Sequence, residues 1–315
     1  MIAFVFPGQG AQYVGMGSDL AHAYPEAWEV FASASAALGF DLTRICWEGP
    51  DELLRQTENT QPAILTASVA ALSVVRARIP APAMCAGLSL GEYAAFVCAG
   101  ALEFADAVRV VRSRGQVMAE AAAGMATAMA ALMGLDGPAV ERVCAQASVR
   151  GVVEPANFNS PGQIVIAGER DAVEAAIELA KAAGAKRAVR LAVSAPFHTS
   201  LMRPVAERFA AVLERAALRD ARIPVVSTVT ARPVSQAEEI RTLLIAQVAS
   251  PVRWEQSVRT MAESGITTFV ELGPGTTLSG LIRKTAPGVQ VLHVEHQESL
   301  DGTLKALEKA GLPTH

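Results

Sequence analysis

The chain has 315 residues, of which 51% are hydrophobic and 18% are charged, and its formal net charge is −4 at pH 7. This length and composition predict a globular protein with a large buried core and exclude a disordered chain. The negative net charge argues against nucleic acid as a partner, because phosphate binding needs a basic surface.

The first part of the chain alternates short apolar runs with longer helical patterns. Residues 2–6 and 83–87 are short runs of the kind that form buried strands. Residues 60–78 predict a long helix with Pro62 in its first turn, where a missing N–H costs little. Two further helices are predicted over residues 90–102 and 106–123.

The pattern changes between residues 125 and 193. Its predicted strands and helices follow the order β-α-β-β-α-β, with an Asn-Ser-Pro-Gly turn at residues 159–162 between the central strands. This order is typical of the ferredoxin-like fold. We therefore expect a ferredoxin-like small subdomain over residues 125–193.

After this segment the chain returns to alternating helices and strands, including a predicted strand at residues 267–272. Such alternation predicts a mostly parallel sheet covered by helices on both faces. The expected fold class is α/β: a large α/β-hydrolase-like domain built from residues 1–124 and 194–315, with the small subdomain inserted into it.

Two further features concern the compartment. No apolar run is long enough to span a membrane, and the first residues lack a basic leader and a cleavage site. The cysteines are dispersed and show no CxxC spacing, which is typical of reduced thiols and argues against disulfides or a zinc site; they are Cys46, Cys85, Cys98 and Cys144. We expect a cytoplasmic protein that does not contact a membrane.

Residues 87–91 have the sequence Gly-x-Ser-x-Gly and lie between a predicted strand and a predicted helix. This is the context of a nucleophile elbow, in which a strained serine faces the N-terminus of the following helix. Ser89 is therefore a candidate nucleophile. An ordinary glycine-rich turn is the alternative that these five residues leave open.

A serine nucleophile needs a base, and His198 is the first candidate because it lies at the junction of the two domains, where clefts form. His293 and His296 have a spacing compatible with a metal ion. Two ligands without a third favour ordinary histidines, so we expect no metal site. They would provide the base only in an ordinary α/β-hydrolase, whose histidine comes late in the chain.

Two more residues are candidates for binding charge. The turn after the first strand, FPGQGAQ, lacks the ending of a phosphate loop, but the N–H of Gln9 or a neighbour could stabilise an oxyanion. Arg114 lies one helix beyond the predicted elbow. It is either a solvated residue of an amphipathic helix or a buried partner for a substrate carboxylate.

The motifs together resemble one family over nearly the whole chain. They are FVFPGQGAQYVGMG, TQPAILTASVAAL, GLSLGEYAA, RG-x-x-M, NFNSPGQIVIAG, VSAPFHTSLM, SPVRWEQSV and ELGPGTTLSGLIRK, in this order. The combination resembles the malonyl-CoA:acyl-carrier-protein transacylases of fatty-acid synthesis and, equally, the freestanding acyltransferases of polyketide synthases.

The resemblance implies a role for each matching residue. Ser89 would accept the acyl group from CoA, and His198 would act first as general base and then as general acid. Arg114 would bind the malonyl carboxylate. The remaining implied roles are an oxyanion hole of Gln9 and Leu90, a histidine-orienting carbonyl at Gln247, and cleft-shaping side chains at Asn157, Asn159 and Phe197.

The reaction implied is transfer of a malonyl group from malonyl-CoA to an acyl carrier protein through a seryl ester, without a bound cofactor. Phe197 before the histidine resembles malonyl-specific members. One departure is Leu88, where the family usually has histidine before the nucleophile. This substitution is either a tolerated variant or a sign of altered acyl choice.

The resemblance also implies an acidic carrier protein as partner and a monomeric enzyme. A carrier of this kind would dock on basic residues. The candidates are Lys181, Lys186, Arg187, Arg190, Arg203, Arg283 and Lys284.

Three alternatives remain at this point. A proofreading thioester hydrolase would share Ser89 and His198 but would not need Arg114. A related acyltransferase would carry a group other than malonyl. A non-catalytic subunit that binds carrier proteins would not need the intact set of Ser89, His198 and Arg114.

Overall fold

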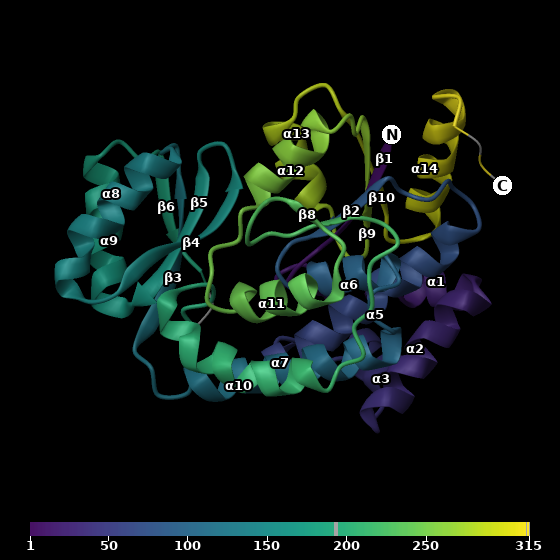
Figure 1. Cartoon of the computed structure of the whole chain (residues 1–315), viewed down its shortest axis with the longest axis horizontal. Coiled ribbons are helices and arrows are strands. Elements are labelled where there is room, and N and C mark those ends of the chain that lie inside the picture. Colours follow the sequence, from purple (N-terminus) through teal and green to yellow (C-terminus); the bar gives the residue numbers. More distant parts are fainter. Residues whose placement is uncertain (192–194, 313, 315) are drawn as a thin grey trace.

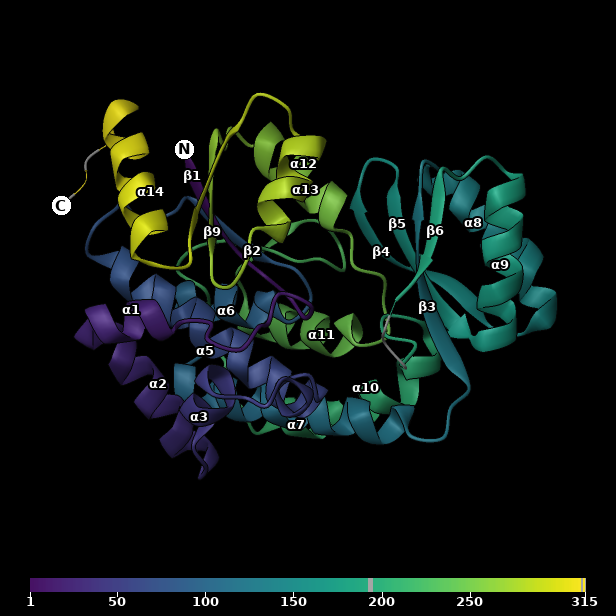
Figure 2. The ribbon, with the colours of Figure 1, turned by 180° about the vertical axis from the view of Figure 1, so that it is seen from behind.

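A computed structural model describes residues 1–191, 195–312 and 314 of the chain. Its strands form a six-stranded sheet and a separate four-stranded sheet. Figure 1 shows the four-stranded sheet with α8 and α9 at one end of the molecule and the six-stranded sheet with the remaining helices at the other. Figure 2 shows the same division from behind.

The six-stranded sheet has the order β10-β9-β1-β2-β7-β8. All neighbours are parallel except β7 and β8, which confirms the prediction of a mostly parallel sheet. Its strands are β1 (Ile2–Phe6), β2 (Met84–Gly87), β7 (Val225–Val226), β8 (Pro233–Val234), β9 (Thr268–Leu272) and β10 (Gln290–Val294).

Helices cover both faces of this sheet. They are α1 (Ser18–Ala23), α2 (Pro25–Leu38), α3 (Leu42–Trp47), α4 (Asp51–Leu54), α5 (Thr57–Arg76), α6 (Gly91–Cys98), α7 (Phe104–Ala122), the short η2 (Ser200–Met202), α10 (Arg203–Glu214), α11 (Ala237–Gln247), α12 (Trp254–Glu263), α13 (Thr277–Thr285) and α14 (Gln297–Lys309).

The alternation of β1 explains the two layers. Successive side chains of a strand point to opposite faces. Phe4 and Phe6 belong to the larger core, which includes α5, α6 and α7, whereas Ala3 and Val5 pack with Trp254 of α12 and with α13. Because both faces are buried, β1 is an unbroken apolar run rather than an alternating one.

Pro62 is not in the first turn of its helix, so this detail of the prediction is wrong. The helix α5 begins at Thr57, which places Pro62 inside it. A proline there cannot donate to the carbonyl four residues earlier, which belongs to Glu58. Arg112 of α7 donates to this Glu58 carbonyl across 2.7 Å, so the freed acceptor is satisfied by a side chain from another helix.

The four-stranded sheet has the order β4-β5-β3-β6, with all neighbours antiparallel. In chain order its elements are β3 (Thr127–Met133), α8 (Gly137–Ala147), η1 (Ser148–Arg150), β4 (Val153–Ser160), β5 (Gln163–Glu169), α9 (Arg170–Ala182) and β6 (Arg187–Arg190). This is the predicted β-α-β-β-α-β order, and the sheet packs with α8 and α9 around a core of its own.

The exact domain bounds stay a prediction. The predicted start at residue 125 lies just before β3, and the predicted change at residues 193 and 194 lies outside the described residues. Backbone hydrogen bonds join the small sheet to the large domain: Val252 donates to the Ala156 carbonyl and Phe158 donates to the Val252 carbonyl, each across 2.8 Å. The strand β4 is therefore attached to the segment between α11 and α12.

Candidate active site

Ser89 lies in the turn between β2 and α6, as the Gly-x-Ser-x-Gly pattern predicts. Its φ of 52° is in the left-handed region, which is strained for a residue with a side chain. A Cβ on Gly87 would lie 1.9 Å from the carbonyl carbon of Gly91, and one on Gly91 would lie 2.1 Å from the Phe6 carbonyl oxygen. The turn therefore closes only with glycine at both positions.

His198 lies against the serine. Its Nε2 is 2.8 Å from Ser89 Oγ, and its Nδ1 is 2.8 Å from the backbone carbonyl oxygen of Gln247. A carbonyl can only accept, so Nδ1 carries the proton and Nε2 is free to accept one from the serine. His198 also has a left-handed φ, of 64°, so both partners of this pair are held in strained backbone conformations.

The environment of His198 keeps its imidazole neutral. Burial, together with the positive charge of Arg114, lowers its pKa from 6.5 to about 4, although the hydrogen bond to the Gln247 carbonyl acts in the opposite direction. A neutral imidazole is the form that can accept a proton from a serine hydroxyl. The pair therefore has the geometry and the protonation state of a nucleophile with its base.

Arg114 of α7 is buried, so of the two alternatives for this residue the solvated one is wrong. Only 2% of the residue is exposed. Its Nη1 donates to Gln61 Oε1 across 2.9 Å, and its Nη2 donates to Ser89 Oγ and to Gln247 Oε1, each across 3.2 Å. Its Nε has no partner among the described residues. The guanidinium thus lies beside the nucleophile. None of its N–H groups donates to a carboxylate of the described residues.

The other predicted site residues are placed as follows. Within the described chain, the backbone N–H groups of Gln9 and Leu90 donate to no other group. Leu90 precedes the first residue of α6, directly after Ser89. Phe197 is half-buried beside His198. Asn157 and Asn159 are half-buried on β4, where Asn157 pairs with Val252.

Sequence reasoning missed the residues that support Arg114. Gln61 and Glu92 are both buried, and neither was singled out although both lie inside quoted motifs. Gln247 was expected to act only through its backbone carbonyl, but its side chain also contacts Ser89, Glu92 and Arg114. A signal was available, because polar residues within an otherwise apolar buried helix such as α5 need partners.

Comparisons with known proteins show the family of the chain. Residues 3–305 match the family model described as acyl transferase domain. The chain is 50% identical over 283 residues to the malonyl CoA-acyl carrier protein transacylase of Escherichia coli K12, covering 90% of this chain and 92% of that protein. It is 44% identical to the Bacillus subtilis 168 protein of the same name, covering 98% of each. The chain belongs to the malonyl-CoA:acyl-carrier-protein transacylase family.

Solved structures of the transacylase family share the fold. One is the acyl carrier protein S-malonyltransferase of Vibrio cholerae, with a TM-score of 0.93 and 44% identity, covering 96% of this chain and 99% of that one. Another is a malonyl-transacylase in complex with a type II polyketide synthase acyl carrier protein, with a TM-score of 0.94 and 44% identity, covering 97% and 99%. As a transacylase family member, this chain is an acyltransferase, which favours transfer over the hydrolase alternative.

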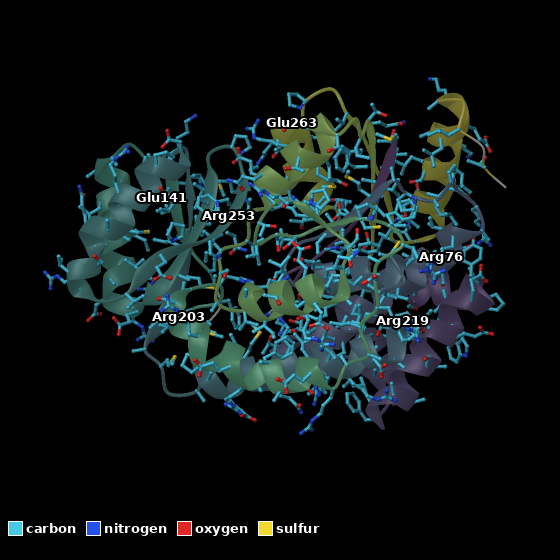
Figure 3. The ribbon with its side chains drawn as sticks, in the orientation of Figure 1. Arg76, Glu141, Arg203, Arg219, Arg253 and Glu263 are labelled. Carbon is cyan, nitrogen blue, oxygen red and sulfur yellow. The ribbon has the colours of Figure 1, made fainter. Side chains whose placement is uncertain are left out.

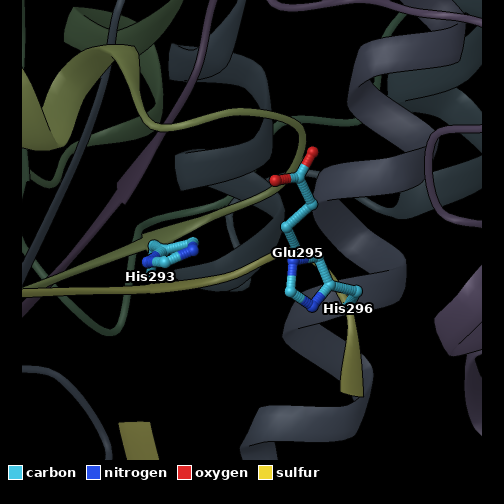
Figure 4. Close-up of side chains that lie close together, drawn as sticks. All are labelled: His293, Glu295 and His296. Carbon is cyan, nitrogen blue, oxygen red and sulfur yellow. The ribbon is translucent and has the colours of Figure 1, made fainter. Parts of the chain in front are cut away.

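The transacylase chain also holds a cluster of His293, Glu295 and His296, whose ligand atoms lie within 4.8 Å of one another. Figure 4 shows the three side chains. The imidazole planes of His293 and His296 are at 88° to each other. His296 Nδ1 accepts the Ser299 N–H that caps α14, and Glu295 Oε1 accepts the Gly275 N–H across 2.7 Å. His296 thus caps α14 and Glu295 holds a backbone N–H, so a metal ion would have to compete with both bonds.

The predicted carrier-docking residues are all exposed. Lys181 and Arg190 form ion pairs with Glu178 and Glu174, so their charges are compensated locally. Arg283 donates to the Val291 carbonyl and Lys284 to Gln163. In the part of the chain that the structure describes, ion pairs are absent at Lys186, Arg187 and Arg203.

Figure 3 places Arg203, and with it Arg253, near the junction of the two sheets. Both of these residues are exposed. Among the described residues of this transacylase family member, no helix is both long enough and apolar enough to cross a membrane.

Proposed function

We propose that this chain transfers a malonyl group from malonyl-CoA to the phosphopantetheine thiol of an acyl carrier protein, through an ester on Ser89. The observation that carries the proposal is the buried guanidinium of Arg114, 3.2 Å from Ser89 Oγ. A buried cation without a carboxylate partner is costly. A substrate that brings its own carboxylate offsets this cost and is thereby selected.

The proposed reaction has two similar halves. Ser89 Oγ attacks the thioester carbonyl of malonyl-CoA while His198 Nε2 takes the hydroxyl proton. The carbon–sulfur bond then breaks, and His198 returns the proton to the departing CoA thiol. In the second half the carrier thiol gives its proton to His198 and attacks the seryl ester, and the proton returns to Ser89 Oγ.

The remaining roles follow from position. The unused N–H groups of Gln9 and Leu90 are assigned to the oxyanion that forms in each half-reaction. The Gln247 carbonyl fixes the tautomer of His198. Phe197, Asn157 and Asn159 are assigned to the walls of the acyl site. Leu88 is half-buried and packs against the core that contains Trp254. This apolar packing supports the view that leucine is a tolerated substitution for the usual histidine.

The test of the proposal is the variant Arg114→Ala. We expect the rate of Ser89 malonylation to fall by about 10²–10³ and the preference for malonyl-CoA over acetyl-CoA to be lost, because the substrate carboxylate loses a buried charged partner. The measurement is intact-protein mass spectrometry after brief mixing with each CoA ester, followed by addition of holo carrier protein.

The matched control is Arg109→Ala, an exposed arginine on the same helix that pairs with Asp106 across 3.0 Å. It should malonylate at the wild-type rate. An adduct in the wild-type protein that drains to water as fast as to carrier protein would support the hydrolase instead. A wild-type protein that accepts a larger acyl group but no malonyl group would support transfer of a group other than malonyl.

We propose that the carrier protein docks on exposed cations of the small sheet, with Lys186 and Arg187 at the start of β6 as a pair for which no ion pair is described. Reversing both to Glu should raise the KM for carrier protein by about tenfold at low salt while leaving malonylation of Ser89 unchanged. The control is the double variant Lys305→Glu and Lys309→Glu, which makes the same change in charge on α14. Equal effects of the two double variants would rule out this docking face.

The proposal includes three further expectations. The exchange of one thioester for another through an ester is close to isoenergetic, so no cofactor is assigned. The dispersed, buried free cysteines support a cytoplasmic location. We propose a monomer that serves fatty-acid synthesis or a polyketide pathway.

A further inference from the structure

Glu92 is a buried carboxylate beside the active site that the mechanism above does not use. It is the second residue of α6, three residues after Ser89, and only 1% of it is exposed. Its Oε2 accepts hydrogen bonds from Thr228 Oγ1 across 2.7 Å and from the Thr228 N–H across 3.3 Å. Burial raises its pKa, and these hydrogen bonds act in the opposite direction. A buried carboxylate held in this way calls for a function.

A third bond to Glu92 connects it with the catalytic residues. Gln247 Nε2 donates to Glu92 Oε2 across 2.6 Å and to the Ser89 carbonyl across 3.1 Å. The other end of the same amide, Oε1, accepts from Arg114 Nη2. A carboxylate can only accept, so Glu92 forces the nitrogen of the amide towards itself and the oxygen towards Arg114.

Charge gives a second connection. Glu92 and Glu271 are the buried acidic residues among the described part of the chain, and Glu271 instead accepts the backbone N–H groups of Leu278 and Ser279 at the start of α13. Among the described residues, the guanidinium of Arg114 donates only to neutral oxygens. The negative charge of Glu92 acts on Arg114 across the Gln247 amide, so Glu92 is the buried counter-charge of this guanidinium.

We propose that Glu92 is a positioning residue, which acts through the side chain of Gln247 to hold the Arg114 guanidinium in place for a substrate carboxylate. This inference rests on the proposed malonyl transfer. It assigns selectivity to a relay of carboxylate, amide and guanidinium rather than to the arginine alone. Glu92 does not contact the acyl group. It sets the orientation of the Arg114 guanidinium towards the substrate carboxylate.

The test is Glu92→Gln, which keeps the size of the side chain and removes its charge. The bond to Gln247 changes from charge-assisted to neutral, and Arg114 loses its counter-charge. We expect the ratio of malonylation to acetylation rates to fall by about tenfold, the difference between a charged and a neutral hydrogen bond. Glu271→Gln is the matched control, because it neutralises the other buried carboxylate; it should leave this ratio unchanged.

A double-mutant cycle separates positioning from general support of the fold. In the Arg114→Ala background, Glu92→Gln should change neither the acyl ratio nor the rate further, because the group through which it acts is gone. Thr228→Val, which removes one donor to Glu92 but keeps the carboxylate, should lower the ratio in the same direction by a smaller factor. This variant remains informative if Glu92→Gln does not fold.

Urea unfolding of the wild-type protein, the two single variants Glu92→Gln and Arg114→Ala, and the double variant gives a measurement that does not depend on the acyl group. We expect the changes in the unfolding midpoint for Glu92→Gln and Arg114→Ala to be non-additive. Additive midpoints, or a malonyl-to-acetyl ratio that stays at the wild-type value in both Glu92→Gln and Thr228→Val, would overturn the inference. A wild-type protein that is not malonylated would instead count against the proposed function, and the unfolding cycle would still test the relay.

Discussion

Replacing Ser89 by alanine is expected to abolish formation of the acyl-enzyme and to lower transfer to the carrier protein by about 10⁴ or more. The reason is that Ser89 Oγ is the atom on which His198 Nε2 and Arg114 Nη2 converge. No other hydroxyl in the described chain is hydrogen-bonded to both His198 and Arg114. The measurement is the mass of the intact protein after brief mixing with malonyl-CoA, together with the steady-state transfer rate.

Ser279→Ala is the matched control for Ser89→Ala. Ser279 is also a buried serine near the start of a helix, but its hydroxyl has no partner among the described residues and lies on α13. This variant should acquire the malonyl mass at the wild-type rate. A malonyl adduct on Ser89→Ala that survives would move the nucleophile to another residue and refute the proposed mechanism.

Replacing His198 by alanine is expected to lower the rate of Ser89 acylation by about 10³–10⁴, because the serine then keeps its proton. His293→Ala should have no such effect, since His293 lies in β10 and its ring packs with His296. A loss of acylation in His293→Ala with normal acylation in His198→Ala would support the ordinary hydrolase arrangement. Single-turnover kinetics with malonyl-CoA measure both variants.

The pH dependence of acylation provides a second check on His198. A base must be neutral to act, and the pKa of His198 is lowered to about 4 by its burial and by Arg114. The rate should therefore stay level from neutral pH down to about pH 5 and fall only as the pH drops through about 4. Arg114→Ala removes one cause of the lowered pKa, so in that variant the fall should begin at a higher pH.

The same shift affects stability. In the unfolded chain His198 takes up its proton near its usual pKa of 6.5, whereas the folded chain resists protonation until about 4. The unfolded state therefore binds more protons between these two values. The contribution of His198 to folding is present above pH 6.5 and is lost as the pH falls towards 4.

Parts of the fold could be predicted from local sequence because β1 is a continuous apolar run, buried along its whole length. The Gly-x-Ser-x-Gly turn is constrained because a Cβ on Gly87 or Gly91 would collide with backbone atoms. The β-α-β-β-α-β order followed from the succession of strand-like and helix-like runs. The position of Pro62 was mispredicted because its compensation comes from Arg112, which is 50 positions away in sequence and invisible to any local pattern.

The nucleophile, the base, Arg114 and the Gln247 carbonyl could be nominated from the sequence through the family resemblance, but the side chains that connect them could not. Spacing alone left both a solvated and a buried Arg114 open, and the packing of α7 against α5 is what buries it beside Gln61. Glu92 and Gln247 are 155 positions apart, so their contact depends on tertiary structure. Spacing along the chain carries no information about such a pair, which is why the relay is visible only in three dimensions.

The hydrogen bonds between β4 and Val252 have a mechanical consequence. Val252 lies only five positions after Gln247, whose carbonyl holds His198 and whose amide holds Arg114. The four-stranded sheet cannot swing away from the six-stranded one without breaking both bonds at Val252 or pulling on this short tether. A protein that binds the small sheet therefore contacts a unit that is hydrogen-bonded to the same short segment that orients His198 and contacts Arg114.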